Sequence, residues 1–185
     1  MIRQALLVLC VCLAGFEGVD VAAQQPTGEY AVKAAYLYNF GRFVEWPTRD
    51  AASDDTFRIC ILGRDPFGPT LDATLTGQMV RGRRVAASRI LSPRDASACA
   101  ILYISASEEP QIATVMAGLT GTTALTVSDI PGFAERGGMI QFVLDASRVR
   151  FAINLPPAED AGLVVSSELL RVAQSVRRRS RPGSA

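Results

Sequence analysis

Histidine is absent from this 185-residue chain, and lysine occurs only once, as Lys33. Without histidine, the chain lacks the usual general base of enzymes and the imidazole of Ser-His and Cys-His nucleophile pairs. The commonest metal ligand is missing for the same reason. An enzyme built from the remaining residues would need a carboxylate or Lys33 with a strongly shifted pKa in a cleft. The composition therefore favours a protein that is not an enzyme, and we expect no cofactor and no metal.

Cysteines and long apolar runs are also scarce. Two of the four cysteines, Cys10 and Cys12, lie in an N-terminal apolar run from Ala5 to Ala14 that follows a basic residue. A run of about ten residues is too short to span a bilayer, which takes about 20. The small residues Val21-Ala22-Ala23 offer a cleavage site. Residues 1–23 are therefore predicted to be a cleaved signal peptide that exports the protein to the periplasm.

No charge of one sign predominates. The whole chain carries a net charge of +1, and the leader holds one basic and two acidic side chains, so its removal gives +2. A charge this near zero argues against nucleic acid or an anionic membrane as the partner. The one basic cluster has four arginines between Arg177 and Arg181. We predict a basic disordered tail over residues 176–185.

Strand-like runs alternate with helical patterns up to residue 127. Apolar residues at helical spacing predict a helix from Glu29 to Trp46, after a short disordered lead-in, and Pro47 ends it. The elements predicted next, in chain order, are a strand at 57–62, a helix capped by Asp65 and ended by Gly77, an edge strand at 82–87, a strand at 100–104, a helix opened by a capping box of Ser105 and Glu108, and a strand at 123–127.

The pattern changes after residue 127. Two strand-like runs, 139–144 and 148–154, are joined by a short loop and predict a hairpin. In the second run apolar residues alternate with polar ones, so Arg150 and Asn154 are expected on a wet face. Helical turns follow, the last capped by Ser166. Residues 24–175 are predicted to form a single α/β domain. It is a three-layer sandwich: a mostly parallel sheet, helices on both faces, and an antiparallel C-terminal hairpin.

Two cysteines remain after cleavage, Cys60 in the first strand and Cys99 at the start of the strand at 100–104. Two cysteines are too few for a zinc site, and in an oxidising compartment they indicate one disulfide. If these strands are neighbours, their spacing of about 4.8 Å suits the Cα separation of a bridge. The bridge is either a structural staple or a redox switch. The absence of a C-x-x-C arrangement and the burial of the thiols favour the staple.

A glycine-rich stretch runs from Pro131 to Gly138. It matches neither phosphate-binding glycine motif and leads into a strand rather than a helix, so it is predicted to be a surface loop with positive-φ turns. An aromatic residue on such a loop, Phe133, is either tucked into the core or offered to a partner.

Five stretches in order, with the leader, resemble the YfiR family over the whole mature chain. They are Glu29 to Pro47, Phe57 to Phe67, Cys99 to Glu108, Leu125 to Gly138 and Met139 to Ala173. The resemblance implies a periplasmic repressor that binds the periplasmic sensor domain of an inner-membrane diguanylate cyclase. Bound in this way, it lowers cyclic-di-GMP signalling and biofilm formation. The resemblance also implies that an outer-membrane lipoprotein sequesters the repressor, that the protein is a homodimer, and that Cys60 and Cys99 are the bridged pair.

One feature departs from the family pattern. The best-known member carries a second disulfide near the glycine-rich loop, whereas this chain has Ala134 and Gln141 in that region and no cysteine. Redox control through a second bridge is therefore not expected in this protein.

Two binding functions compete at this stage. A regulator of a partner protein predicts an exposed apolar patch around Phe133, the C-terminal hairpin and the last helix. A periplasmic small-molecule binding or sensing protein predicts a concave pocket with converging polar groups such as Arg136, Arg150 and Asn154. The candidate partner-binding residues are Phe133, Arg136, Arg150 and Asn154.

Overall fold

The structure is a computed structural model that describes residues 25–47 and 56–180. The predicted signal peptide and the last five residues of the predicted tail lie outside these ranges. Within the described residues, no helix is both long and apolar enough to cross a bilayer.

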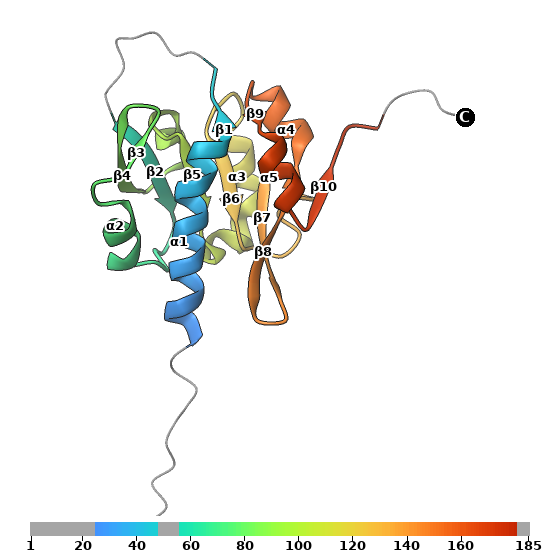
Figure 1. Cartoon of the computed structure of the whole chain (residues 1–185). Helices are drawn as coiled ribbons and strands as arrows, with labels where there is room; N and C mark the ends of the chain where they lie inside the picture. The colour runs from blue at the N-terminus through green and yellow to red at the C-terminus, as the bar shows by residue number, and fades with distance from the viewer. Residues whose placement is uncertain (1–24, 48–55, 181–185) are drawn as a thin grey trace, which may run out of the picture.

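Eight strands form one sheet in the order β10-β8-β7-β6-β5-β2-β4-β3 (Figure 1). The strands are β2 (Thr56–Leu62), β3 (Met79–Val80), β4 (Arg83–Ile90), β5 (Ile101–Ile104), β6 (Leu125–Ser128), β7 (Ile140–Asp145), β8 (Arg148–Asn154) and β10 (Ser175–Arg177). Neighbouring strands from β4 to β7 are parallel, as is the pair β8 and β10, whereas β7–β8 and β3–β4 are antiparallel. A separate two-stranded antiparallel sheet joins β1 (Val44–Glu45) to β9 (Val164–Val165).

Helices cover both faces of the large sheet. The helices are α1 (Gln25–Phe43), α2 (Pro69–Leu75), α3 (Ile112–Gly118), α4 (Leu155–Asp160) and α5 (Ser167–Val172), with 3-10 helices η2 (Pro93–Ala98) and η3 (Ala106–Gln111). Buried residues of α1, α2, α4 and α5 join one core cluster, and those of η2 and α3 join a second one. The predicted three-layer α/β sandwich with an antiparallel hairpin is confirmed.

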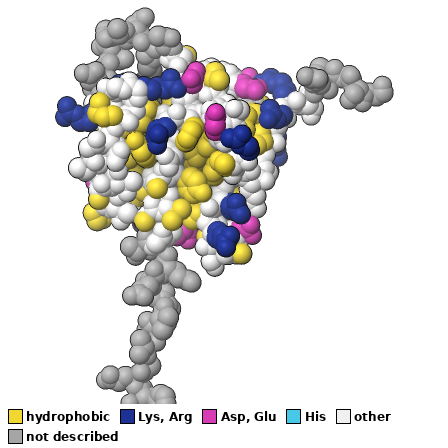
Figure 2. Space-filling view, viewed as in Figure 1, with side chains coloured by type: hydrophobic (Ala, Val, Ile, Leu, Met, Phe, Trp, Pro, Cys, Tyr) yellow, Lys and Arg dark blue, Asp and Glu magenta, His cyan; other side chains and the backbone are white. Residues whose placement is uncertain are grey.

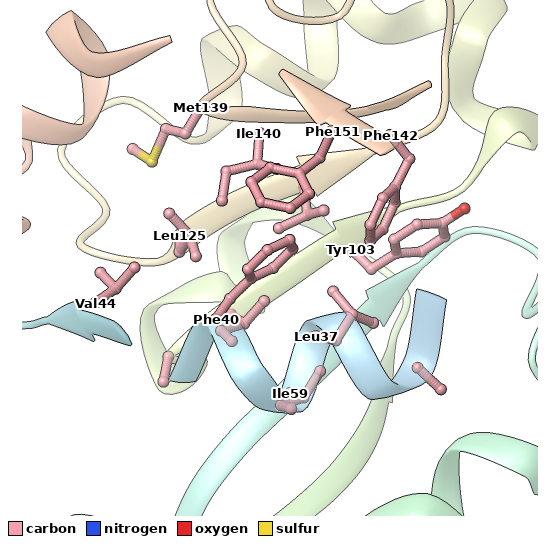
Figure 3. Packing of buried hydrophobic residues seen from close by; sticks show 14 of the residues in the cluster. Leu37, Phe40, Val44, Ile59, Tyr103, Leu125, Met139, Ile140, Phe142 and Phe151 are labelled. Atoms are coloured by element: carbon pink, nitrogen blue, oxygen red, sulfur yellow. The ribbon is translucent and has the colours of Figure 1, made fainter. Parts of the chain in front are cut away.

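Strand β5 shows why two layers of helix are needed. All four of its side chains are buried; Ile101 and Tyr103 belong to the α1-side cluster, while Leu102 belongs to the α3-side cluster. On the α1 side, Phe40 packs edge-to-face on Phe151 with ring centroids 5.2 Å apart (Figure 3). A strand whose successive side chains point to opposite faces, all of them apolar, is stable only when both faces are covered.

The first helix differs from its predicted bounds. It begins at Gln25, inside the predicted disordered lead-in, and ends at Phe43. Val44 and Glu45 leave the helix because they pair with β9, Val44 opposite Val165. A two-residue strand of this kind carries no periodic signal that sequence analysis could detect.

The second helix begins later than predicted. Asp65 does not cap it; its Oδ1 accepts hydrogen bonds from the backbone N–H groups of Phe67 and Gly68, at 2.8 and 3.2 Å, and so forms a turn. The helix then starts at Pro69 after Gly68, whose φ of +52° suits glycine. The other Asp65 oxygen binds Arg89 on β4.

The capping box predicted at Ser105 and Glu108 is also wrong in detail. The Ser105 hydroxyl accepts from the Ser107 N–H, and the segment forms the 3-10 helix η3, which contains Pro110, before α3 begins at Ile112. Ser166, in contrast, caps α5 as predicted by accepting from the Leu169 N–H at 3.2 Å.

The boundary of the C-terminal tail requires a correction. Val176 and Arg177, predicted to be disordered, pair in parallel with Ile153 and Asn154 as part of β10. Val176 packs against the α1-side core, which explains why the sheet extends to this residue. Strand β10, and not the hairpin, is therefore the outermost strand on this side of the sheet.

The disulfide joins Cys60 on β2 to Cys99, two residues before β5. The two strands are neighbours, and the Cα atoms of the cysteines lie 5.8 Å apart. Both residues are 1% exposed within the α3-side core. The predicted bridge is confirmed, and its burial favours a structural staple over a redox switch, because a reductant or partner thiol cannot reach the sulfur atoms of the folded protein.

We expect the double variant Cys60→Ala/Cys99→Ala to unfold at a lower urea concentration than the oxidised wild type. The cysteines are 39 residues apart in sequence. Loss of a bridge that closes a loop of this size lowers the unfolding free energy by about 4 kcal/mol on the chain-entropy model. Addition of a reductant to the double variant serves as the control and should leave its urea unfolding midpoint unchanged. Equal stability of the oxidised wild type and the double variant would contradict the staple.

Candidate functional site

Phe133, the aromatic residue of the glycine-rich loop, is fully buried. Its ring lies in the α3-side core at 0% exposure, so it cannot contact a partner in this conformation. The loop closes tightly around it: the Gly138 N–H donates to the Phe133 carbonyl at 2.9 Å, and a Cβ at Gly138 would collide with the ring. Of the two alternatives left open by the sequence, the structure favours the core.

Asn154 is not on a wet face and is corrected too. It is 5% exposed because the glycine-rich loop folds over the end of β8. Its Nδ2 donates to the carbonyl oxygens of Ala134 and Gly138 at 2.8 and 3.1 Å. The Ala134 N–H in turn donates to Gln141 Oε1 at 3.1 Å. These two positions, which lie where the resemblance places a second disulfide, are thus joined by a hydrogen bond in this chain.

Arg136 and Arg150 are exposed. Arg136 lies in the glycine-rich loop with its guanidinium 3.9 Å from Glu109, and Arg150 lies on β8 opposite Val143. Asn154, in contrast, is buried beneath the glycine-rich loop. The side-chain amide of Asn154 is thus bound to backbone carbonyls of the loop, whereas Arg136 and Arg150 point to solvent.

The sequence analysis did not identify a buried polar cluster around Lys33. The Lys33 side chain belongs to the buried side of α1, one heptad before Phe40, and the residue is only 3% exposed. Its Nζ lies 2.5 Å from Glu29 Oε1 and 2.6 Å from Asp129 Oδ2. Tyr30 also donates to Asp129 Oδ2, at 3.1 Å. Extension of the apolar stripe of α1 toward its N-terminus would have indicated that Lys33 is buried and needs acidic partners.

The position of Asp129 follows from the sheet. It comes directly after β6, at the carboxyl end of a parallel strand, where the first turns of α1 pass over the sheet. The preceding Ser128 fixes this end: its hydroxyl donates to the Ile104 carbonyl at 2.7 Å and accepts from the Ile130 N–H at 3.0 Å. The cluster therefore joins the first helix to the end of the central strands.

The environment of Lys33 favours its charged form. Burial lowers the pKa of Lys33, but hydrogen bonds to Asp129 and Glu29 outweigh this effect and raise the pKa above its ordinary value. A catalytic lysine needs a lowered pKa, so that the free amine is available near neutral pH. Lys33 is held in the opposite state, as a buried cation between two carboxylates.

Two polar atoms beside this cluster have no hydrogen-bond partner among the described residues: the Tyr103 hydroxyl and Asp129 Oδ1. Burial raises the pKa of Tyr103 far above its ordinary value, and the charge of Asp129 raises it further. Burial also raises the pKa of Tyr30. Both tyrosines therefore stay neutral.

A groove lies between the first turns of α1 and the β7–β8 hairpin. Its outer part has a volume of about 550 Å³ and is lined by Gly28, Glu29, Val32, Leu144, Ser147, Arg148 and Val149. An inner pocket of about 130 Å³ shares Glu29, Leu144 and Val149 and reaches Lys33 and Asp129. Val32 and Leu144 are large apolar residues that remain 45% and 59% exposed. The groove thus combines apolar walls with an ionic floor.

The hairpin that forms one wall of this groove is well defined. It turns through Ala146 and Ser147, which adopt positive φ angles of 44° and 64° between the paired residues Asp145 and Arg148. Two central residues with positive φ match the twist of the flanking strands. Figure 1 shows the hairpin projecting beside the N-terminal end of α1.

The described residues contain no group of three or more His, Cys, Asp or Glu side chains placed to hold a metal ion. The lining of the groove and its lysine-centred floor offer ion pairing, hydrogen bonding and apolar contact. These interactions suit recognition of a partner or ligand.

Comparison with known proteins gives one family. The profile of a family described as YfiR/HmsC-like matches residues 30–174. A crystal structure of a conserved domain protein from Vibrio cholerae O1 biovar El Tor is similar in fold, with a TM-score of 0.52 at 11% sequence identity. The alignment covers 78% of this chain and 60% of that one, so this chain spans about three fifths of its length.

A second solved structure is described as the ABC domain in complex with L-Trp from Streptococcus pneumonia. It has a TM-score of 0.48 at 13% identity and covers 65% of this chain and 55% of that chain. Its similarity is too low to support an inference about this protein.

We expect alkaline pH to destabilise the protein through the lysine-centred cluster. Lys33, Tyr30 and Tyr103 all have raised pKa values, so each holds its proton more tightly in the folded than in the unfolded state. Their contribution to stability is complete below the unfolded pKa values and is lost as pH rises above about 10. The unfolding free energy of Tyr103→Phe, measured in urea between pH 8 and pH 12 (roughly the range of these titrations), should fall less steeply than that of the wild type.

Tyr38→Phe is the matched control for this experiment. Tyr38 also lies on α1 but is half-buried and outside the cluster, with Arg42 over its ring. The unfolding free energy of Tyr38→Phe should therefore fall with pH as steeply as that of the wild type. If Tyr103→Phe followed the wild-type pH profile as well, Tyr103 would not contribute to the loss of stability at alkaline pH.

Proposed function

Because this chain belongs to the YfiR/HmsC-like family, we propose that it is an exported periplasmic regulator that represses an inner-membrane diguanylate cyclase. It binds the sensor domain that the cyclase exposes in the periplasm, and so lowers cyclic-di-GMP signalling and biofilm formation. The family match over residues 30–174 carries this proposal, because it extends over nearly the whole described domain.

The structure supports a periplasmic location through the disulfide. Bridges such as Cys60–Cys99 form and persist in oxidising compartments and are rare in the cytosol. The predicted signal peptide at residues 1–23 agrees with this location. A homodimer and an outer-membrane lipoprotein that sequesters the regulator complete the proposal.

The surface also supports binding without catalysis. On the α1 face, Lys33 is held as a cation by its ion pairs with Glu29 and Asp129, and its pKa is raised. Figure 2 shows a band of apolar side chains across this face between clusters of arginine. Leu144 on the hairpin and Val172 on α5 are 59% and 60% exposed. Exposed apolar residues on these two elements are consistent with a surface that meets another protein.

The test is capture of the cyclase from solubilised inner membranes of the source bacterium. Oxidised mature protein is immobilised, and retained proteins are identified by mass spectrometry. We expect a membrane diguanylate cyclase to be retained, and addition of the protein to membranes should lower their synthesis of cyclic-di-GMP. Retention of other proteins only, with unchanged synthesis, would refute the repressor function.

A reduced sample provides the control for the folded state. Because both cysteines are buried, complete reduction requires the protein to open. We expect capture to decrease in proportion to the loss of native structure measured by circular dichroism, because the bridge stabilises the fold that binds.

A second function, binding of a small molecule, is favoured by one observation. The groove between α1 and the hairpin continues into the inner pocket, where Glu29, Lys33 and Asp129 bring charged groups together beside apolar walls. A ligand held there would bind the folded state alone and raise the melting temperature. We expect a thermal-shift screen of periplasmic metabolites to yield a stabilising compound whose effect is lost in Leu144→Asp and kept in Leu91→Asp.

Leu91 is the control because it is 97% exposed but follows β4, which is separated from β7 by β2, β5 and β6. If no compound shifted the wild type, the groove would have no role as a ligand site under these conditions. An equal loss of the shift in both variants would place the ligand outside the groove.

A further inference from the structure

The outer side of the β7–β8 hairpin carries exposed arginines. Phe151 and Ile153 of β8 point into the α1-side core, so the alternate residue Arg150 points to the opposite face of the sheet. On β10, Val176 lies beside Ile153 and packs on the same core, so Arg177 lies on the same face as Arg150.

Two further arginines extend this group. Arg136, from the glycine-rich loop, lies on the same side of the sheet as the core that holds Phe133. Arg148 lies at the tip of the hairpin and also borders the groove. We call Arg136, Arg148, Arg150 and Arg177 the arginine face. The basic atoms visible at the hairpin in Figure 2 mark its tip, seen from the α1 side.

The charges of the arginine face are only weakly compensated. Arg136 lies 3.9 Å from Glu109, and Arg177 lies 3.8 Å from Glu135, which are loose contacts between exposed groups. Arg150 has no carboxylate at ion-pair distance anywhere in 25–47 or 56–180. Surface ion pairs of this kind contribute little stability, so these arginines are available for other partners.

The arginine face also offers apolar contact. Val143, directly opposite Arg150, and Ala152, on the same face of β8, are only half-buried. Arginine is enriched in protein interfaces together with apolar residues.

The arrangement of the charges indicates the shape of the partner. Arg177 lies beside Asn154, four residues along the strand direction from Arg150 and six from Arg148. At about 3.4 Å per residue, the row extends over about 20 Å. Guanidinium groups bind carboxylates in bidentate fashion, and a row of this length suits an extended acidic segment.

We propose that the arginine face docks an acidic, carboxylate-rich segment of a partner protein. If the proposed function holds, this segment belongs to the sensor domain of the cyclase. An anionic lipid surface fits less well. A flat bilayer would meet Glu135 and Asp145, which are exposed beside the arginines, whereas a peptide can align its carboxylates with the arginines alone.

The test compares two charge-reversal variants of equal size. Arg150→Glu/Arg177→Glu changes the arginine face but leaves Arg148, its residue at the groove, unchanged. Arg84→Glu/Arg94→Glu changes exposed arginines on β4 and η2 and is the matched control. Binding of a fluorescent glutamate-rich peptide is measured by anisotropy at low and at physiological salt. Capture of the cyclase from inner membranes is measured in parallel.

We expect the wild type to bind the peptide with an affinity that decreases with salt. The arginine-face variant should bind about tenfold more weakly or worse, and the control variant should match the wild type within about twofold. Capture of the cyclase should likewise be weaker for the arginine-face variant than for the wild type and the control variant. If Arg150→Glu/Arg177→Glu reduced the native circular dichroism signal, Arg150→Gln/Arg177→Gln would replace it, with the same expectation.

The possible failures are distinguishable. Equal peptide binding by all three proteins would overturn the docking proposal, and so would binding of phosphatidylglycerol vesicles in place of the peptide. Cyclase capture that persists in the arginine-face variant would also overturn it, while the proposed function would stand. If the wild type retained no cyclase, the proposed function would fail. The docking proposal would then be decided by the peptide measurement alone.

Discussion

Strand β5 must be covered on both faces, and the rest of the fold follows from this requirement. Its four buried side chains point alternately toward the α1-side and the α3-side cores, so neither layer of helix can be removed without exposing the centre of the sheet. The chain meets the requirement by locking the layers together. The disulfide holds the start of β5 to β2 within the α3-side core, and the ion pairs of Lys33 hold α1 to the end of β6 on the other side. The first link is a covalent bond and the second is an ion pair.

The elements that could be predicted from sequence are those with a strong local signal. The strand at Phe57–Leu62, the apolar run of β5, the hairpin and the Ser166 cap each carry their own pattern of apolar or capping residues. The strands β1, β9 and β10 could not be predicted, because their two or three residues are defined by partners distant in the chain, such as Val44 with Val165. Asp65 was misassigned because its carboxylate forms a turn and binds Arg89, a contact that no local pattern contains.

The candidate sites show the same limit. Arg150 was expected on a solvent-exposed face and is exposed, whereas Asn154, expected on the same face, is buried. The sequence left Phe133 open between the core and a partner contact, and the glycine-rich loop buries it. The burial of Asn154 and Phe133 depends on how that loop folds back over β8, which is a tertiary contact. Lys33 was identified only as the single lysine. Its position on the buried stripe of α1 was readable, but its partner Asp129 lies 96 residues away and became visible only in three dimensions.

The burial of Lys33 affects how this protein can be handled chemically. It is the only lysine in the chain, it is 3% exposed, and its raised pKa keeps it protonated. Amine-reactive dyes, cross-linkers and coupling resins act on exposed, unprotonated amines, so the Lys33 side chain does not react with them while the protein is folded. The same reagents applied to a partially unfolded sample would label Lys33, so labelling at this residue reports the molecules whose first helix has detached from the sheet.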